Sequence, residues 1–237
     1  MREFEQMEMQ FFIKPGEDER VKYYEYWKEQ RMNWYVNVLN IPREKLRFKP
    51  HDKLAHYAKA AVDIEYEFPF GFKEIEGIHC RGDYDLSNHE RYCKKNLHIL
   101  DPETNESFIP NVIETSCGCD RIILMLLSEF VTNESSDDKQ RLVFRINNDL
   151  APIKYAILPL MKKQELTTVA RDIYDKMKLK YMCSYDDSGS IGKRYVRNDI
   201  IGTPYCVTVD YQTLEDSTVT IRHRDTMEQK RVNVENL

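Results

Sequence analysis

An unusual set of carboxylates stands in strand-like settings of this 237-residue chain: Glu3, Glu5, Glu8, Glu74, Glu76 and Glu114. Successive side chains of a strand alternate between its faces, so Glu3 and Glu5 would share one face and Glu8 would take the other. Carboxylates that face a sheet crevice would bind an ammonium group or a metal ion, because burying them unpaired is costly. The alternative, favoured by composition alone, is that each is a solvated strand residue.

Other familiar catalytic motifs are incomplete. The run from Asp187 to Lys193 resembles a phosphate loop, but only two residues separate Gly189 from Gly192, and Arg194 follows the lysine where a Ser or Thr is required. His51 and His56 have no second pair at the distance that a zinc site needs, nor do Cys117 and Cys119, and no Gly-x-Ser-x-Gly elbow is present. These absences weaken Walker-type, zinc-finger and simple hydrolase interpretations.

The elements that must position the carboxylates follow from apolar periodicity. Alternation predicts strands at 4–13 and 62–70, and a third strand is predicted at 109–114. Apolar spacing from Asp18 predicts a helix that stops before Pro42, although Arg31 interrupts its apolar positions, and a second helix is predicted at 120–130. Strands without helical crossovers indicate an α+β domain with an antiparallel sheet.

The second part of the chain has a different pattern. Strands and helices alternate there, with strands predicted at 153–158, 181–185, 205–210 and 218–223 and helices at 167–178 and 190–200. This order indicates a small α/β domain with a parallel or mixed sheet. Residues 132–140 are polar and aperiodic, which predicts a surface loop, and we place the domain boundary between residues 149 and 150.

Composition narrows the class of protein. An apolar share of 41% beside 32% charged residues indicates a globular chain, and no apolar stretch approaches the ~20 residues of a membrane helix. Six scattered cysteines suggest reduced thiols and a cytoplasmic location. Only eight glycines argue against Gly-rich phosphate loops.

The charge is unevenly distributed. Residues 151–237 carry 14 basic and 12 acidic side chains, against 21 and 28 in residues 1–150. The basic residues of the second part cluster in a way that suits a polyanion, although an ordinary solvated face is favoured on charge alone. They are Lys193, Arg194, Arg197, Arg222 and Arg224.

Several segments of the chain resemble those of a known family. The segment from Arg2 to Glu8 resembles the second strand of motif 2 in class II aminoacyl-tRNA synthetases, in the form of the homodimeric glycyl-tRNA synthetases, and Glu114 to Arg121 is similar to their motif 3. Further similar segments follow in the same order: 51–59, 63–66, 74–78, 150–154, 185–195 and 225–229. Several co-linear motifs make chance agreement very improbable.

The resemblance implies a glycine-tRNA ligase. Such an enzyme uses ATP and Mg²⁺ to form glycyl-adenylate and then transfers the glycyl group to tRNA(Gly). The implied fold is the rear part of a class II catalytic domain over residues 1–149, with an antiparallel sheet and helices, followed by an anticodon-binding domain with a mixed sheet over residues 150–237. The full-length enzyme would be a cytoplasmic homodimer without membrane or DNA partners.

Site residues carry over by matching position. Glu8, assisted by Glu114, would hold the ammonium of glycine, and Ser116 would exclude larger amino acids. The glycine pocket would comprise Phe4, Glu5, Gln6, Met7, Glu8, Glu114, Thr115, Ser116, Cys117 and Gly118. ATP would contact Arg2, Glu3, Phe4, Glu74, Ile75, Gly118, Cys119, Asp120 and Arg121.

Roles within the nucleotide set are also implied. Phe4 would stack on adenine and Arg121 would grip the γ-phosphate. Glu74 would contact ATP or hold Mg²⁺, so that Arg121 and Glu74 are the candidate catalytic residues. The tRNA would contact the basic cluster Lys193, Arg194, Arg197, Arg222 and Arg224.

Motif 1 and the first strand of motif 2 have no counterpart in the sequence. We therefore expect a C-terminal fragment of the synthetase that alone binds tRNA weakly and catalyses poorly or not at all. A second hypothesis is a non-catalytic tRNA-binding or regulatory paralogue, against which the intact Glu8, Glu114, Ser116 and Arg121 speak. Synthesis of diadenosine polyphosphate would use the same residues and is not separable by sequence.

Overall fold

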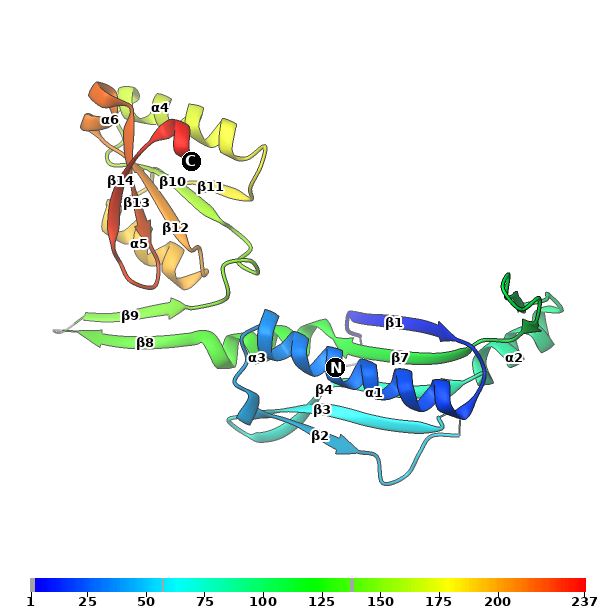
Figure 1. Ribbon diagram of the computed structural model, residues 1–237. Helices are drawn as coiled ribbons and strands as arrows, with labels where there is room; N and C mark the ends of the chain where they lie inside the picture. The colour runs from blue at the N-terminus through cyan, green and yellow to red at the C-terminus, as the bar shows by residue number, and fades with distance from the viewer. Residues whose placement is uncertain (1–2, 57, 137–138) are drawn as a thin grey trace. The chain divides into compact units, whose positions relative to one another are not determined.

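The computed structural model describes residues 3–56, 58–136 and 139–237, which form two compact units, 1–128 and 129–237. The first unit has an antiparallel sheet with helices, and the second has a mixed sheet between helices (Figure 1). The predicted fold class is therefore confirmed for both parts. No helix among the described residues is long and apolar enough to cross a bilayer.

The first unit is built on a five-stranded antiparallel sheet. Its strands lie in the order β1 (Gln6–Ile13), β7 (Asn111–Gly118), β4 (Gly71–Gly82), β3 (Ala60–Phe68) and β2 (Leu46–Pro50). The predicted strands at 4–13, 62–70 and 109–114 correspond to β1, β3 and β7 with shifted ends. No strand was delimited at β2 or β4, because charged residues such as Arg47, Lys49 and Lys73 interrupt their apolar patterns, although the setting of Glu74 and Glu76 was identified as strand-like.

One face of this sheet is covered by α1 (Glu17–Asn33), which lies along β1, β7 and β4. Ile13, Ile113 and Cys80 from the strands form a buried cluster against Tyr24 and Trp27 of the helix. The predicted helix up to Pro42 is interrupted, since α1 passes into a π-helical turn at Trp34–Val38.

Arg31, which broke the apolar pattern of the helix, has a structural partner. Its Nε and Nη2 atoms donate to Oε1 and Oε2 of Glu76 at 2.6 and 3.1 Å, and Glu76 is only 1% exposed. A two-pronged arginine–carboxylate contact of this kind fixes orientation as well as distance. The pair therefore fastens α1 to β4 at a position where an apolar side chain would leave Glu76 buried without this cationic partner.

Smaller elements complete the first unit: a 3₁₀ turn at Arg43–Lys45, α2 (Tyr84–Cys93), the short hairpin β5 (Ile99–Leu100) and β6 (Ser107–Phe108), and α3 (Cys119–Phe130). The prediction of a helix at 120–130 corresponds to α3, which leaves β7 directly at Gly118. This strand-to-helix corner lines part of the candidate site.

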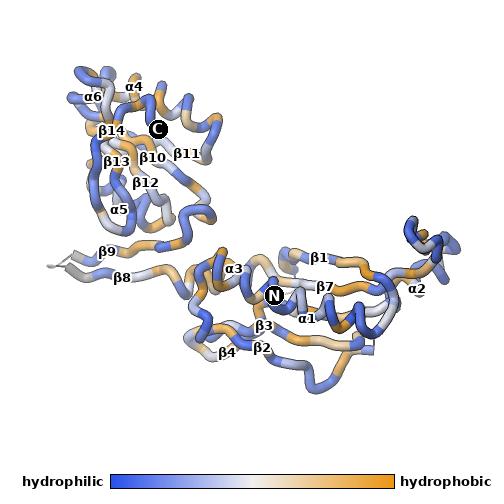
Figure 2. Tube along the Cα trace, in the orientation of Figure 1, coloured by the Kyte–Doolittle hydropathy of each residue, from blue (hydrophilic) through white to orange (hydrophobic). Residues whose placement is uncertain are grey.

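The second unit has a mixed sheet in the order β11 (Cys183–Tyr185), β10 (Tyr155–Pro159), β12 (Tyr205–Val209), β13 (Thr218–His223) and β14 (Gln229–Asn233). The first three strands are parallel, and the last two pair antiparallel. Figure 2 shows hydrophobic residues along β10 and β12 at the centre of this sheet. The predicted strands and helices of this part all correspond to observed elements, whereas β14 and the short α6 (Tyr211–Asp216) were not predicted.

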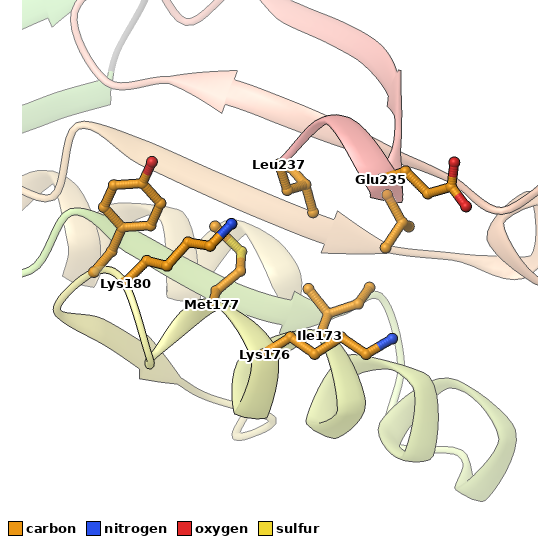
Figure 3. Close-up of a pocket in the computed structure, with 8 residues that line it drawn as sticks. Ile173, Lys176, Met177, Lys180, Glu235 and Leu237 are labelled. Atoms are coloured by element: carbon orange, nitrogen blue, oxygen red, sulfur yellow. The ribbon is translucent and has the colours of Figure 1, made fainter.

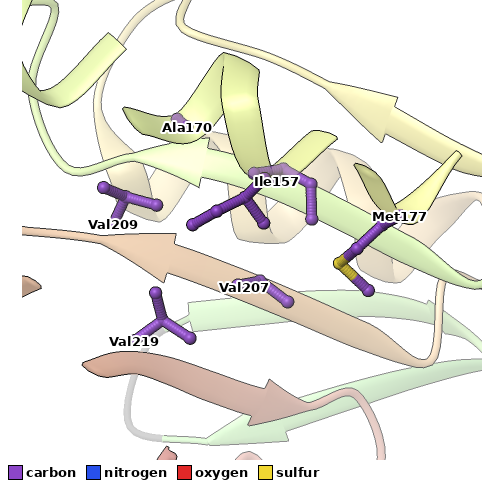
Figure 4. Packing of buried hydrophobic residues seen from close by; sticks show 7 residues of the cluster. Ile157, Ala170, Met177, Val207, Val209 and Val219 are labelled. Carbon is purple, nitrogen blue, oxygen red and sulfur yellow. The ribbon is translucent and has the colours of Figure 1, made fainter. Parts of the chain in front are cut away.

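Helices cover both faces of the second sheet. α4 (Gln164–Met177) packs on one face, where its Ala170 and Met177 meet Ile157, Val207 and Val219 (Figure 4). α5 (Ile191–Ile200) packs on the other face through Ile191 and Tyr195, against Ala156, Leu158 and Cys206. A 3₁₀ turn at Val234–Asn236 follows β14.

A hairpin replaces the loop that was predicted at 132–140. β8 (Val131–Ser136) pairs antiparallel with β9 (Lys139–Phe144), while residues 137–138 lie outside the described part. Arg141 Nε donates to Asp199 Oδ2 at 2.9 Å, and Arg145 Nη1 donates to Asp225 Oδ1 at 3.0 Å. The loop prediction was wrong because polar contacts stabilise the hairpin: Arg141 pairs with Glu134 across it, and Asp199 and Asp225 come from much later in the chain.

Because of these contacts, the boundary between the two compact units lies before the hairpin, between residues 128 and 129. The hairpin belongs to the second compact unit, which begins at residue 129, whereas the sequence placed the division between residues 149 and 150. Gly202 shows how closely the hairpin packs. Its φ is +80°, and a Cβ there would lie 2.9 Å from Cγ2 of Ile146 and 3.1 Å from the carbonyl oxygen of Phe144.

We predict that Gly202→Ala lowers the free energy of unfolding by about 2 kcal/mol or more, because the substitution adds backbone strain and a clash with the chain after β9. Gly192→Ala is the matched control. That glycine lies inside α5 with nothing within 4 Å of a Cβ, so alanine should raise stability by about 0.5–1 kcal/mol. Urea denaturation of both variants measures the difference; equal effects would contradict the packing described.

Candidate active site

The face of the first sheet opposite α1 is polar, and its centre is a row of three residues. Glu8 of β1 lies opposite Ser116 of β7, and Ser116 lies opposite Gly77 of β4. Directly paired residues share a face, so these three residues stand side by side. Ser116 Oγ donates to Glu8 Oε1 at 3.4 Å, and Gln6 Nε2 donates to Ser116 Oγ. Three residues of the predicted glycine pocket therefore lie together in the structure: Gln6, Glu8 and Ser116.

The next row along the same face is centred on Glu114, which is 8% exposed. Its Oε2 accepts from Gln10 Nε2 at 2.6 Å, and its Oε1 accepts from Arg81 Nη1 at 3.1 Å. Arg81 is held in turn by Asp85, at 2.6 and 3.1 Å. Hydrogen bonds and a nearby cation therefore support the negative charge of Glu114 without filling all its acceptor positions.

Sequence reasoning missed Gln10, His79 and Arg81 as members of this face. The sequence spacing could have indicated Gln10 and His79, because alternate residues of a strand share a face. Gln10 lies two residues from Glu8, and His79 lies two residues from Gly77. The missing step was the pairing of β4 with β7, which depends on a strand that was not predicted.

Three predicted pocket residues point the other way. Met7, Thr115 and Cys117 alternate with the polar row, and Cys117 Sγ lies against the carbonyl oxygen of Met7 at 3.7 Å. Thr115 and Cys117 are 4% and 5% exposed, and burial raises the pKa of the Cys117 thiol to about 11. Their side chains do not line the polar face, which corrects the prediction for this part of the set.

The remaining predicted residues divide according to exposure. Ile75 is 1% exposed and belongs to the core, so its side chain is not available to ATP. Glu3, Phe4 and Glu5 precede β1 and are exposed, and the carbonyl oxygen of Glu5 accepts from the Cys119 amide at 3.0 Å. Arg2 lies outside the described residues.

A hollow opens at the corner where β7 becomes α3. Among the described residues its lining belongs to the predicted nucleotide set: Phe4, Gly118, Asp120 and Arg121. Phe4 is 57% exposed, which leaves its ring free to stack on a planar ligand. The direct passage of the strand into the helix puts Arg121 one helical turn from Gly118, so that the hollow has an aromatic side and a cationic side.

Arg121 and Glu74 meet at this corner. Arg121 Nη1 lies 3.1 Å from Glu74 Oε1 and donates to the Glu74 carbonyl oxygen at 3.2 Å, with both side chains about half exposed. The two also line a neighbouring hollow with Phe68, Phe70, Lys73 and Leu124. Such an exposed pair can exchange partners with an arriving phosphate and cation at small cost.

Glu74 has a carboxylate of the kind that Mg²⁺ binds. The described residues contain no cluster of three or more His, Cys, Asp or Glu that could hold a metal ion by itself. Magnesium in nucleotide sites uses one or two carboxylates together with substrate phosphates, and Glu74 fits that pattern.

The predicted tRNA contacts of the second unit are mostly buried. Arg194, Arg222 and Arg224 are 1%, 6% and 2% exposed. Arg194 donates to the carbonyl oxygens of Pro159, Leu160, Asp186 and Gly189. Arg222 donates to both oxygens of Asp199 at 2.9 and 3.0 Å. These arginines therefore stabilise the fold, which corrects the prediction that they face a polyanion.

Lys193 and Arg197 remain on the surface of α5. Arg197 Nη2 donates to the Ser188 carbonyl oxygen at 2.8 Å and also to Asp186 Oδ2. Burial raises the pKa of Asp186, but hydrogen bonds from Ser188 and Arg197 outweigh it and bring the pKa to about 2. Of the cluster, Lys193 is the side chain most available for an anionic partner.

A separate pocket of the second unit lies between the end of α4 and the C-terminal turn (Figure 3). Its lining is mixed apolar and basic: Ile173, Lys176, Met177, Lys180, Tyr181, Val234, Glu235 and Leu237. None of the predicted site residues lines this pocket.

Comparisons with known proteins match both parts of the chain. Residues 154–237 match the family model described as an anticodon binding domain. Proteins named glycine-tRNA ligase are 50% identical over 99% of this chain in Chlorobaculum tepidum, 52% over 99% in Borreliella burgdorferi, and 48% over 100% in Alkaliphilus oremlandii. The chain spans about half the length of these curated relatives, at 49%, 54% and 51%.

A solved structure shows the same fold at lower identity. Prolyl-tRNA synthetase from Cryptosporidium parvum, complexed with L-proline and AMP, matches all of this chain and 49% of its own, with a TM-score of 0.65 and 16% identity. At that identity the likeness concerns the fold alone.

We predict that Arg194→Met lowers the free energy of unfolding by about 3 kcal/mol, because it strips four carbonyl groups of a buried donor. Lys193→Met, at the exposed neighbouring position, should change it by less than about 0.5 kcal/mol. Thermal and urea unfolding of the two variants provide the measurement. Similar stability of both proteins would show that Arg194 is not a structural residue.

Proposed function

We propose that this chain, a homologue of bacterial glycine-tRNA ligases along nearly its whole length, supplies the glycine-binding face and the anticodon-binding part of such a ligase. The observation that carries the proposal is the polar row of Glu8, Ser116 and Gly77, with Glu114 beside it on the same face. The activity of the whole enzyme would be the ATP-dependent attachment of glycine to tRNA(Gly).

Glycine suits this face by charge and by size. Its ammonium group would lie between the carboxylates of Glu8 and Glu114, which supply negative charge from two neighbouring strands. Ser116 stands between them, with its hydroxyl bonded to Glu8 and to Gln6. A hydroxymethyl group held in place there would leave little room for a Cβ on the substrate, so that larger amino acids are excluded.

The hollow beside the row would receive ATP. Phe4 would stack on the adenine and Arg121 would leave Glu74 to grip phosphate oxygens. Glycine's carboxylate would then attack the α-phosphate, forming glycyl-adenylate with release of pyrophosphate. Mg²⁺, held by Glu74 and the phosphates, would neutralise phosphate charge. The chain's own residues contribute by positioning the two substrates and by stabilising charge.

The second part would recognise the tRNA. We assign residues 150–237 to an anticodon-binding domain and residues 1–149 to the catalytic part, and we expect the full-length enzyme to be a cytoplasmic homodimer. Lys193 and Arg197, which are exposed on α5, would contact tRNA phosphates.

Glycine binding by this chain tests the proposal directly. We predict that Glu8→Gln weakens glycine binding at least tenfold, because a charge-assisted contact worth about 1.5–3 kcal/mol is lost. Glu29→Gln, on the exposed side of α1, removes the same charge elsewhere and should leave binding unchanged. Calorimetry or NMR titration gives both affinities. If the chain is a regulatory paralogue without a glycine pocket, neither the unaltered chain nor either variant will bind glycine.

Ser116 provides a test of selectivity. We predict that Ser116→Gly narrows the preference for glycine over alanine by about tenfold, because the space vacated by the hydroxymethyl group accepts a methyl group. The ratio of the two dissociation constants in the variant and in the unaltered chain is the measurement. An unchanged ratio would mean that Ser116 does not limit substrate size.

A further inference from the structure

His79 is a titratable side chain beside the candidate ammonium site, and the proposed chemistry leaves it unused. It belongs to β4, and it lies opposite Glu114 of β7 and opposite Ala61 of β3 on the polar face. Its ring leans over Gly77, where a Cβ would be only 2.7 Å from Cε1 of His79. The absence of a side chain at position 77 is therefore what allows the imidazole to lie beside the row of Glu8 and Ser116.

The Nδ1 atom of His79 is buried and has no hydrogen-bond partner among the described residues. It lies 3.6 Å from Oε1 of Glu114, slightly beyond hydrogen-bond distance. The side chain of His79 is 17% exposed, so protons can reach the ring from solvent. A small movement would convert this near-contact into a charge-assisted hydrogen bond once the ring carries a proton.

The charged groups around His79 come from every strand next to it. Glu114 of β7 and Asp63 of β3 favour a proton on the ring, whereas Arg81 of β4 and His51, which follows β2, oppose it. His51 is held by Asp63 at 2.7 Å, and its ring meets that of His79 edge to face at 5.7 Å. Burial is the largest influence and lowers the pKa of His79. The imidazole is consequently neutral at neutral pH, which leaves Glu114 available to another cation.

We infer that protonated His79 and the ammonium group of glycine compete for the carboxylate of Glu114, so that His79 is a positioning residue that makes glycine binding sensitive to acid. The inference rests on the proposed function, because it requires glycine at the polar face. At neutral pH the uncharged ring fills the space over Gly77 and leaves the Glu114 charge to the substrate. In acid the Nδ1–H group donates to Oε1 of Glu114 and offsets that charge.

The direction of the pH effect on glycine binding follows from thermodynamic linkage between proton binding and glycine binding. A proton and a ligand that exclude each other weaken one another equally, so the dissociation constant of glycine rises as pH falls through the pKa of His79. The rise approaches about tenfold for each pH unit below that pKa. The experiment covers the range between about pH 5 and 7.5, which spans the ordinary pKa of a histidine side chain.

The experiment measures the glycine dissociation constant of the chain by calorimetry across this pH range. We expect acid weakening in the unaltered chain, an almost flat profile for His79→Gln, which keeps a polar side chain that cannot ionise, and the original profile for His89→Gln. His89 is an exposed histidine of α2 and serves as the matched control. Identical pH profiles for the unaltered chain and His79→Gln would overturn the inference.

A second measurement needs no variant. NMR titration of the His79 ring, with and without saturating glycine, should show a lower pKa when glycine is bound, and an unchanged pKa would overturn the inference. Glycine binding that is independent of pH refutes only the role of His79. An absence of glycine binding at neutral pH refutes the proposed function and this inference together.

Discussion

The pairing of β1 with β7 is the constraint on which the first unit depends. Gln6 through Ile13 lie opposite Gly118 through Asn111 without a break in register. Because side chains alternate along a strand, a slip of one residue would exchange the two faces of β1 completely. Glu8 and Gln10 would then turn toward α1, and Phe11 and Ile13 would turn toward solvent. The apolar packing of the covered face thereby fixes the position of the carboxylates on the other face.

The two faces use charge in different ways. On the covered face, Glu76 is neutralised within the fold by a two-pronged contact with Arg31. On the polar face, Glu114 is supported by Gln10 and Arg81 but keeps acceptor positions free. Glu76 is paired with one arginine on the covered face, whereas Glu114 shares its oxygens between an amide and an arginine on the face that is open to a ligand. Two glutamates of similar exposure, 1% and 8%, are thus distinguished by their partners.

The sequence predicted the parts of the structure that depend on local pattern. The alternation around Glu8 placed β1, and the apolar run after Asp120 placed α3. Patterns failed where the stabilising partner is distant in sequence. The polar hairpin β8–β9 depends on Asp199 and Asp225, and β4 mixes buried residues with Glu74 and Glu76. Clustered arginines in the sequence could not reveal that Arg194 and Arg224 donate to carbonyl oxygens inside the fold. Resemblance to a family supplied roles by position, and strand alternation then decided which of those side chains reach the site.

The hairpin belongs to the second compact unit but lies outside the stretch that the family model matches. The match to the family model described as an anticodon binding domain begins at residue 154, whereas the second compact unit begins at residue 129. A chimera joined at residue 154 would remove Arg141 from Asp199 and Arg145 from Asp225, and it would uncover Gly202. A graft between related chains that keeps the hairpin with the second unit retains these contacts. In this protein the segment to exchange is therefore longer than the segment that the anticodon binding domain model matches.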